Sequence, residues 1–239
     1  MRLDDPDLVA REYASEERFL ARRAVFTDLV EGPNAEELSF EAVREVTPRR
    51  VLEVGCGPGY FAERVQRELG AAVVAVDCSP RMVELARARG VDARVGDAQD
   101  LPLRDESVEC VVANWVLHHL PDFDRGVAEL ARVLAPAGRL VSATFGEEHV
   151  REVWAWLDYE KAAALGFSRE NGAEPLRRHF AAVDRRDADA VVVFPDRDAV
   201  RRYVASTICG AHLADSLPAF EGELRALSRQ AVFVCEKAR

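Results

Sequence analysis

Short apolar runs alternate with longer amphipathic stretches along the middle of the chain. The runs have the length of buried strands and fall at residues 51–54, 72–76, 93–95, 108–113 and 140–145. Stretches with helical spacing separate most of them, at residues 60–69, 80–89 and 123–134. Strands that alternate with helices of this length indicate a parallel sheet with helices on both faces. The almost continuously apolar strand runs are typical of strands that are buried on both sides.

The N-terminal part of the chain predicts helices instead of this alternation. Asp5 followed by Pro6 is a strong start signal, and the first helix is expected to run to Val30. Asn34, with a glutamate three residues later, is a plausible cap for a second helix. We therefore expect two helices within residues 1–46.

The C-terminal third is less regular. Residues 147–183 carry several aromatic side chains, including Trp154 and Tyr159, and a second helical piece near 175–182. This segment fits two structures equally well, an amphipathic helix pair over one sheet edge or a cap over a pocket. The chain then predicts a strand at 190–194, a helix at 196–206 and a last strand at 231–236.

Composition places the chain among globular proteins. Its 239 residues are 49% hydrophobic and 31% charged, which is enough for one large α/β domain. The longest purely apolar run, residues 71–76, is far shorter than the roughly 20 residues that a spanning helix needs. The acidic N-terminus does not resemble a signal peptide. The five cysteines include no Cys-x-x-Cys pair, which favours a reducing cytoplasm without a structural metal site. Cys110 and Cys235 lie in apolar runs and are expected in the core.

The net charge of −10 is spread along the chain, and no third of it is basic. Nucleic-acid binding relies on clustered Lys and Arg side chains, which this sequence lacks beyond arginine pairs. The charge pattern therefore lowers the weight of a nucleic-acid partner without removing it. We expect no membrane partner, because the sequence has no spanning run, and a homodimer is left open.

A glycine-rich turn carries the most informative chemistry. The run from Val51 leads into Gly55-Cys-Gly57-Pro-Gly59, and a predicted helix follows at once. Such a turn exposes backbone N–H groups at a helix N-terminus and lets a ligand approach the main chain closely. Tyr60 occupies the position where a dinucleotide fingerprint has its third glycine or alanine, which argues against close packing around a pyrophosphate.

Two acidic residues strengthen this signal. Glu53 precedes the glycines and can accept hydrogen bonds from the loop or from a ligand's ammonium group. Asp77 ends the second strand about 20 residues after the glycines, which is the spacing of a carboxylate that binds a ribose diol.

At this point the sequence resembles the class I S-adenosylmethionine-dependent methyltransferases, in particular their small-metabolite type 11 branch. The resemblance covers about residues 48–146. After the glycine turn and Asp77, it continues through Gly96-Asp97-Ala98 behind the third strand, through Asn114 to His119 at the tip of the fourth, and through the turn at Gly138 before the fifth.

The resemblance implies a Rossmann-like, doubly wound α/β fold. Its seven-stranded sheet would have the order 3-2-1-4-5-7-6, with the last strand antiparallel, N-terminal helices and a helical insertion after strand five. We expect a single domain over residues 1–239. It would comprise a helical lid at 1–46, a cofactor-binding core at 48–146, a cap insertion at 147–183 and the last two strands at 184–239.

The resemblance also implies roles for residues around S-adenosylmethionine. Gly55 and Gly57 would face its methionine part, Asp77 would hold both ribose hydroxyls, and Asn114 would offer backbone near the amino group. Asp97 and Ala98 would bind the adenine. Met82 could pack on the adenine ring or simply fill the core, and Tyr13 and Arg18 are candidates for the lid.

Catalysis of methyl transfer needs few protein groups, because the cofactor carries an activated methyl group. A general base is required only when the acceptor is protonated at neutral pH. His118 and His119, just past the fourth strand, are candidates for this base or else pack the strand tip. Trp115 is a candidate for an apolar wall, His149 and His212 could line an acceptor pocket, and His179 is expected at the surface.

The leading hypothesis is an enzyme that methylates O, N or C of a small molecule. The same fold could direct a cyclisation or act on a carrier-bound acyl group. A nicotinamide-dependent oxidoreductase is disfavoured by Tyr60 and by Gly96-Asp97-Ala98. A non-catalytic cofactor-binding subunit is disfavoured by the intact set of glycines and acids. The identity of the acceptor cannot be read from the sequence.

Overall fold

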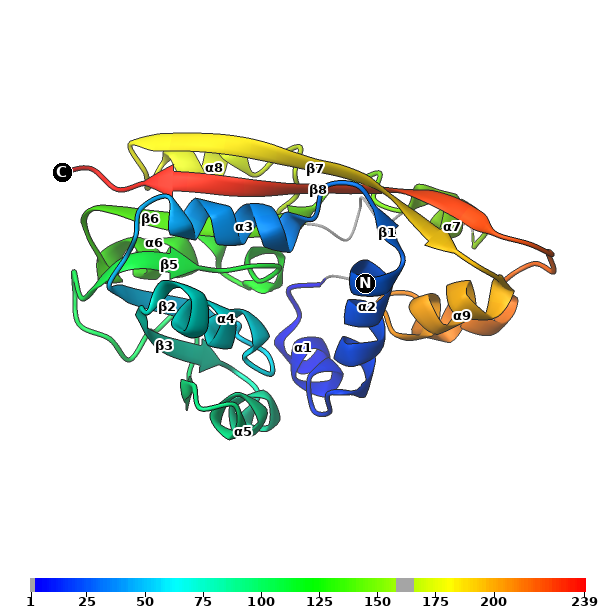
Figure 1. Cartoon of the computed structure of the whole chain (residues 1–239), viewed down its shortest axis with the longest axis horizontal. Coiled ribbons are helices and arrows are strands. Elements are labelled where there is room, and N and C mark those ends of the chain that lie inside the picture. Colours follow the sequence, from blue (N-terminus) through cyan, green and yellow to red (C-terminus); the bar gives the residue numbers. More distant parts are fainter. Residues whose placement is uncertain (1–2, 158–165) are drawn as a thin grey trace.

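A mixed β-sheet runs through the whole molecule (Figure 1). The computed structural model describes residues 3–157 and 166–239. Within these residues the sheet has eight strands in the order β1-β7-β8-β6-β5-β2-β3-β4. The strands are β1 (Val30–Glu31), β2 (Arg50–Val54), β3 (Ala72–Asp77), β4 (Asp92–Val95), β5 (Val108–Val112), β6 (Leu134–Phe145), β7 (Ala182–Phe194) and β8 (Leu224–Glu236).

Strand β2 lies between β3 and β5 and is parallel to both. The chain first adds β3 and β4 on one side of β2 and then adds β5 and β6 on the other side. At such a change of side a crevice forms beyond the carboxyl ends of the two neighbouring strands, here β2 and β5. Strand β8 is antiparallel to β6 and to β7, and the long β7–β8 pair extends past the parallel part of the sheet. This arrangement places the parallel strands on one side of the molecule and the outer end of the β7–β8 pair on the other (Figure 1).

Helices cover both faces of the parallel strands. Cores on the two faces contain Phe40, Phe61 and Val83 on one side and Leu130 and Leu176 on the other. The first group belongs to α3, α4 and α5, and the second to α6 and α8. The helices are α1 (Pro6–Glu12), α2 (Glu17–Asp28), α3 (Ala35–Arg44), α4 (Tyr60–Leu69), α5 (Pro80–Ala88), α6 (Phe123–Val133), α7 (Arg151–Ala155), α8 (Ala173–Arg177) and α9 (Arg197–Ala205), with 3₁₀ turns at Leu117–His119 and Ala211–Ser216.

The doubly wound α/β prediction and the predicted order of seven strands are confirmed. The strand count was wrong by one, because β1 adds an eighth strand beside β7. Val30 pairs with Val192 in this two-residue strand. A strand of two residues is too short to show an alternating pattern, and this one directly follows a helical pattern, so the sequence did not predict it.

The first predicted helix is interrupted. Instead of one helix from Pro6 to Val30, α1 ends at Glu12 and α2 begins at Glu17. The carbonyl of Tyr13 accepts a hydrogen bond from the Ser79 hydroxyl at 2.6 Å, so a tertiary contact satisfies a group at the break. The second helix begins at the predicted Asn34 cap, whose side chain accepts from the amide of Glu36. Glu37 does not complete the predicted capping pair, because its carboxylate binds Arg64 instead.

The C-terminal strands were placed correctly but were predicted too short. Strand β7 begins at Ala182, where the sequence predicted the end of a helical piece, and β8 begins at Leu224. The first half of β7 lies largely exposed and carries many charged residues, so its pattern is that of a loop. Trp154 is buried, whereas Tyr159 lies outside the described residues.

Two further expectations concern burial. Cys110 and Cys235 are fully buried, which confirms that both belong to the core. Among the helices that the structure describes, none is long and apolar enough to cross a membrane.

Candidate active site

The glycine turn lies between β2 and α4. Gly55 adopts a left-handed conformation with φ of 66°, and its amide donates to the carbonyl of Val76 at 2.7 Å. A Cβ at this position would lie 2.2 Å from Cγ2 of Val116. Both the backbone conformation and the close approach of the β5 tip therefore require glycine here.

Asp77, at the end of β3, holds the glycine turn in place. Its Oδ2 accepts from the amide of Gly57 at 2.8 Å, and its Oδ1 accepts from the amide of Ser79 at 2.9 Å. The side chain is buried, and this burial raises its pKa, while the two backbone donors act in the opposite direction. Each carboxylate oxygen can accept a second hydrogen bond from a ligand.

Glu53 and Asn114 each bury one polar atom without a hydrogen-bond partner among the described residues. These atoms are Oε2 of Glu53 and Nδ2 of Asn114. The other amide atom of Asn114, Oδ1, accepts from the Ser39 hydroxyl at 3.1 Å and from the amide of Ala143 at 2.9 Å, so the orientation of the amide is defined. Burial raises the pKa of Glu53 well above its usual range, against a backbone hydrogen bond from Ala62.

The loop after β4 carries the predicted adenine-binding residues. Asp97 is exposed, and its Oδ1 accepts from the amide of Gln99 at 2.8 Å. Ala98 is half-buried and packs against the apolar core. Met82 is fully buried at the start of α5, where its amide donates to the Ser79 hydroxyl.

The N-terminal helices reach both loops. The carbonyl of Tyr13 accepts a hydrogen bond from the hydroxyl of Ser79, which lies two residues after Asp77. The ring of Phe19, on α2, packs on the glycine turn, since a Cβ at Gly57 would lie 3.5 Å from it. Helices α1 and α2 therefore close over the carboxyl ends of β2 and β3.

A cavity of about 210 Å³ lies between these helices, the tips of β5 and β6, and the inner side of β8 and α9. Its walls are mainly apolar and carry the rings of Phe19, Phe26, Trp115, Phe145, Trp154 and Tyr203, so we call it the aromatic cavity. Tyr13, His118 and His119 lie at the same wall. The prediction that Trp115 forms an apolar wall agrees with this geometry, and its indole donates to Oε1 of Gln230 at 3.1 Å.

His119 is held in one defined tautomer. Its Nδ1 lies 2.8 Å from the carbonyl oxygen of Leu3, so this nitrogen carries the proton. Nε2 then accepts from the hydroxyl of Tyr13, at 3.3 Å. Burial lowers the pKa of His119, which keeps the ring neutral near pH 7. His118 is more deeply buried, and its ring centre lies 4.2 Å from that of His119.

Other predicted residues lie elsewhere. Arg18 is half-exposed and pairs with Glu12, outside the cavity wall. His149 is fully buried between the rings of Phe26 and Phe145 and accepts from a backbone amide, so it supports the wall from behind. His212 is exposed and away from the cavity, which contradicts its expected place in a pocket.

Sequence reasoning missed the contribution of the C-terminal region. Tyr203 on α9, Ser228 and Gln230 on β8, and the turn at residues 207–209 all line the cavity. Tyr203 shares a helix face with Val200 and Val204, so its pattern is that of a core residue. Only Gln230, a polar residue within an apolar strand, gave a local signal.

Comparisons with known proteins agree on the class. Residues 52–142 match the family of methyltransferase domains. The chain is 37% identical, over 150 residues, to malonyl-acyl-carrier-protein O-methyltransferase of Methylococcus capsulatus; the match covers 59% of this chain and 54% of the relative. The matched regions of the first curated relatives span about half of their length or less.

Solved structures share the fold over nearly the whole chain. Phosphoethanolamine N-methyltransferase 2 of Haemonchus contortus, in complex with S-adenosyl-L-methionine, has a TM-score of 0.67 at 16% identity and covers 100% of this chain and 60% of its own. The cyclase SpnF has a TM-score of 0.62 at 19% identity, with coverage of 96% and 95%.

The strand order and the glycine turn with its acidic partner thus define a Rossmann-like methyltransferase fold. Residues 52–142 match the methyltransferase domain family, and the strand order and glycine turn of the chain resemble those of the class I S-adenosylmethionine-dependent methyltransferases.

Proposed function

We propose that this protein binds S-adenosylmethionine across the carboxyl ends of β2 to β5 and transfers its methyl group to O, N or C of a small acceptor in the aromatic cavity. One observation carries the proposal. Tyr13 and Phe19 line the cavity and also touch the loops that hold Asp77 and Gly57. The cofactor cleft and the cavity therefore share a wall, as an in-line transfer between the two requires.

The two unpartnered buried atoms fit the methionine part of this cofactor. Its ammonium group supplies a donor for Oε2 of Glu53, and its carboxylate supplies an acceptor for Nδ2 of Asn114. Buried polar atoms are seldom left without a partner, so a ligand that satisfies both is favoured. Gly55 and Gly57 lie beside this position and permit its close approach to the main chain.

The remaining cofactor contacts follow the strand ends. Asp77 accepts from the two ribose hydroxyls through its free lone pairs. Asp97 accepts from the adenine amino group, and the amide of Ala98 donates to a ring nitrogen. Met82 supports the adenine from below. Residues 1–46 act as the lid and the aromatic wall excludes water from the transfer.

The bound cofactor supplies an activated methyl group, and the chain supplies alignment and, for a hydroxyl acceptor, a base. Held by Glu53, Asn114 and Asp77, S-adenosylmethionine would supply the methyl group to the acceptor oxygen, and its sulfur would keep the electron pair of the broken carbon–sulfur bond. The acceptor proton passes to the oxygen of Tyr13 as the Tyr13 proton moves to Nε2 of His119. The neutral tautomer of His119 is ready to take that proton.

Two similar proteins are named for other reactions. The relative from Methylococcus capsulatus, by its name, methylates a malonyl group on a carrier protein. The cyclase SpnF has the same fold. Release of S-adenosylhomocysteine on turnover distinguishes methyl transfer from a cyclisation.

The first test is calorimetric titration of the protein with S-adenosylmethionine, with NADH as a comparison ligand. We expect binding of the sulfonium, a loss of about 1–3 kcal/mol in Asp77→Ala because the ribose hydroxyls lose a charged partner, and no binding of NADH. The matched control is Asp92→Asn, which should bind like the wild type. Asp92 begins β4, whereas Asp77 ends the parallel strand β3, so the two carboxylates lie at opposite edges of the sheet. Binding of NADH but not of the sulfonium would refute the proposal.

A further inference from the structure

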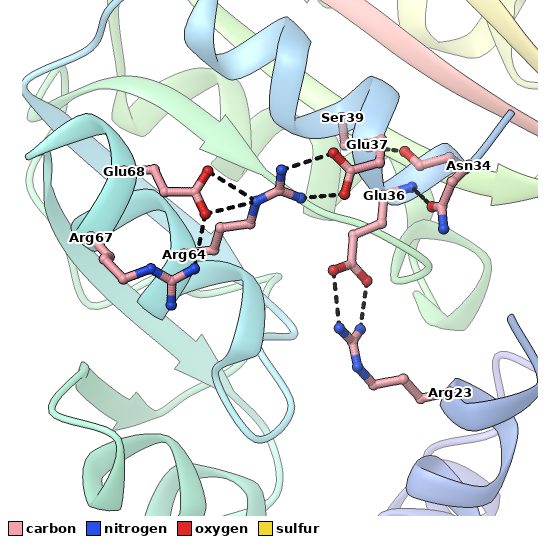
Figure 2. A network of polar contacts seen from close by, with 9 residues as sticks. Arg23, Asn34, Glu36, Glu37, Ser39, Arg64, Arg67 and Glu68 are labelled. Atoms are coloured by element: carbon pink, nitrogen blue, oxygen red, sulfur yellow. Dashed lines mark hydrogen bonds and ion pairs between the residues drawn. The ribbon is translucent and has the colours of Figure 1, made fainter. Parts of the chain in front are cut away.

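The aromatic cavity contains two arginines, and both are already paired with carboxylates of the chain. Arg23, on α2, forms a bidentate ion pair with Glu36, on α3; the longer of its two contacts is 3.1 Å (Figure 2). Arg22 donates to Glu12 and to the carbonyl of Ser206. Arg22, Arg23 and Glu36 lie in the cavity wall itself, and Glu12 is buried behind it.

The position of Glu36 is set by its own helix. Glu36 is in the first turn of α3, where its amide donates to the capping side chain of Asn34 at 2.8 Å and the helix dipole favours a negative charge. The neighbouring Glu37 points the other way and pairs with Arg64 of α4 (Figure 2). Two consecutive carboxylates thus serve different partners, and only Glu36 reaches the cavity.

Arg23 is held by a second contact as well. Its guanidinium carbon lies 4.7 Å from the ring centre of Tyr60, which directly follows the glycine turn. The ion pair with Glu36 and this cation–π contact together fix the guanidinium at the junction of α2, α3 and α4. Its orientation therefore does not depend on a ligand.

We propose that the acceptor site selects an uncharged, ring-bearing molecule with a hydroxyl group, and that Glu36 determines this specificity by neutralising Arg23. This inference rests on the proposed function and names the substrate class of the same site. Apart from the sulfonium of the bound cofactor, a carboxylate acceptor would need a free cation in this apolar wall, because a buried charge without a partner is costly. Among the described residues of the wall, the arginines offer none.

Glu36 is a strong competitor for Arg23 because it is part of the chain. An incoming carboxylate would have to displace a tethered, bidentate partner and would also lose its own freedom on binding. A neutral ring does not need to displace Glu36 from Arg23, and it gains contact with the surrounding aromatic side chains. Its hydroxyl would then face Tyr13 and His119.

The test compares two probes of matched shape, 2-naphthol and 2-naphthoate, at pH 7 in the presence of S-adenosylhomocysteine. At this pH the first is neutral and the second carries a carboxylate. Binding is measured by calorimetry and by the fluorescence of the cavity tryptophans. We expect the wild type to bind 2-naphthol at least tenfold more tightly than 2-naphthoate.

Three variants assign this preference to Glu36. Glu36→Gln releases Arg23 and should raise the affinity for 2-naphthoate about tenfold, with little change for 2-naphthol. Glu37→Gln, the adjacent carboxylate outside the cavity, should leave both affinities unchanged. Adding Arg23→Gln to Glu36→Gln should return the affinity for 2-naphthoate to the wild-type value. Circular dichroism and binding of S-adenosylhomocysteine show that each variant is folded.

The outcomes separate the two proposals. If the wild type fails to bind S-adenosylhomocysteine, the proposed function is refuted, while the probe ratio still tests the pocket. A wild type that prefers 2-naphthoate, that binds neither probe, or whose preference is unaffected by Glu36→Gln overturns the assignment of a neutral acceptor.

Discussion

The hydroxyl of Tyr13 lies 3.3 Å from Nε2 of His119, although 106 residues separate the two in the chain. Their rings meet edge to face, with centres 5.9 Å apart. The contact joins the N-terminal helices to the tip of β5 at the wall of the aromatic cavity. Because the Nδ1–H group of His119 donates to the Leu3 carbonyl, Nε2 is the acceptor of the ring. In the hydrogen bond between the two side chains, the Tyr13 hydroxyl is therefore the donor.

Removing the tyrosine hydroxyl tests this pair. In Tyr13→Phe the neutral form of His119 loses a hydrogen bond, so the pKa of His119 should rise from its lowered value. The acid limb of the pH–rate profile should then move to higher pH, and kcat should fall about tenfold with little change in KM for S-adenosylmethionine. An unchanged profile would show that the pair is structural.

The two adjacent histidines should differ in their effect on the rate. With a hydroxyl acceptor found by a screen for S-adenosylhomocysteine release, His119→Gln should lower kcat about 10²- to 10³-fold, because the proton acceptor is lost. His118→Gln is the matched control and should stay within a few-fold of the wild type. Because burial lowers the pKa of His119, wild-type activity should persist as the pH falls through 6.5. Equal losses of kcat in the two variants would contradict the role of His119 as the acceptor of the Tyr13 proton.

Glu53 should lower stability when no ligand is bound. Its folded pKa is raised, so the unfolded chain releases the proton first, and the stability of the protein decreases as the pH rises above about 4.5. Glu53→Gln should therefore increase the free energy of unfolding at pH 8 by about 1–2 kcal/mol while weakening binding of S-adenosylmethionine. Urea denaturation at several pH values measures the first effect and calorimetry the second. Glu41→Gln, an exposed control, should change neither; a destabilised Glu53→Gln would contradict this account.

Gly55 and Gly70 have nearly the same backbone conformation but different surroundings. Their φ angles are 66° and 68°, yet a Cβ would meet Val116 at 2.2 Å in the first case and nothing within 4 Å in the second. Gly70→Ala should cost about 1–2 kcal/mol from the left-handed conformation alone. Gly55→Ala should cost clearly more in urea denaturation.

A second substitution isolates the steric part of this cost. Adding Val116→Ala to Gly55→Ala removes the colliding methyl group and should recover part of the lost stability. If Gly55→Ala and Gly70→Ala cost the same, the close approach of Val116 to the glycine turn is not a constraint.

The sequence by itself determined the parallel part of the sheet. Helix α4 begins and ends at the residues predicted, Tyr60 and Leu69, because the flanking Gly59 and Gly70 act locally. The place of Asp77 at the end of the second strand also followed from local spacing, whereas the order of seven strands followed from the resemblance to the methyltransferase family. In these segments burial on both faces, turn chemistry and helix caps all favour the same structure.

Only the tertiary structure decided the aromatic cavity. The break after Glu12 depends on a bond between Tyr13 and Ser79, and the tautomer of His119 depends on Leu3 and Tyr13. The cavity wall combines residues from both ends of the chain, and its aromatic members, such as Phe26 and Tyr203, have an ordinary core pattern in their own elements. Local periodicity reports which side of an element is buried, but not which distant element it faces, so the shape and charge of the cavity appear only when the chain is folded.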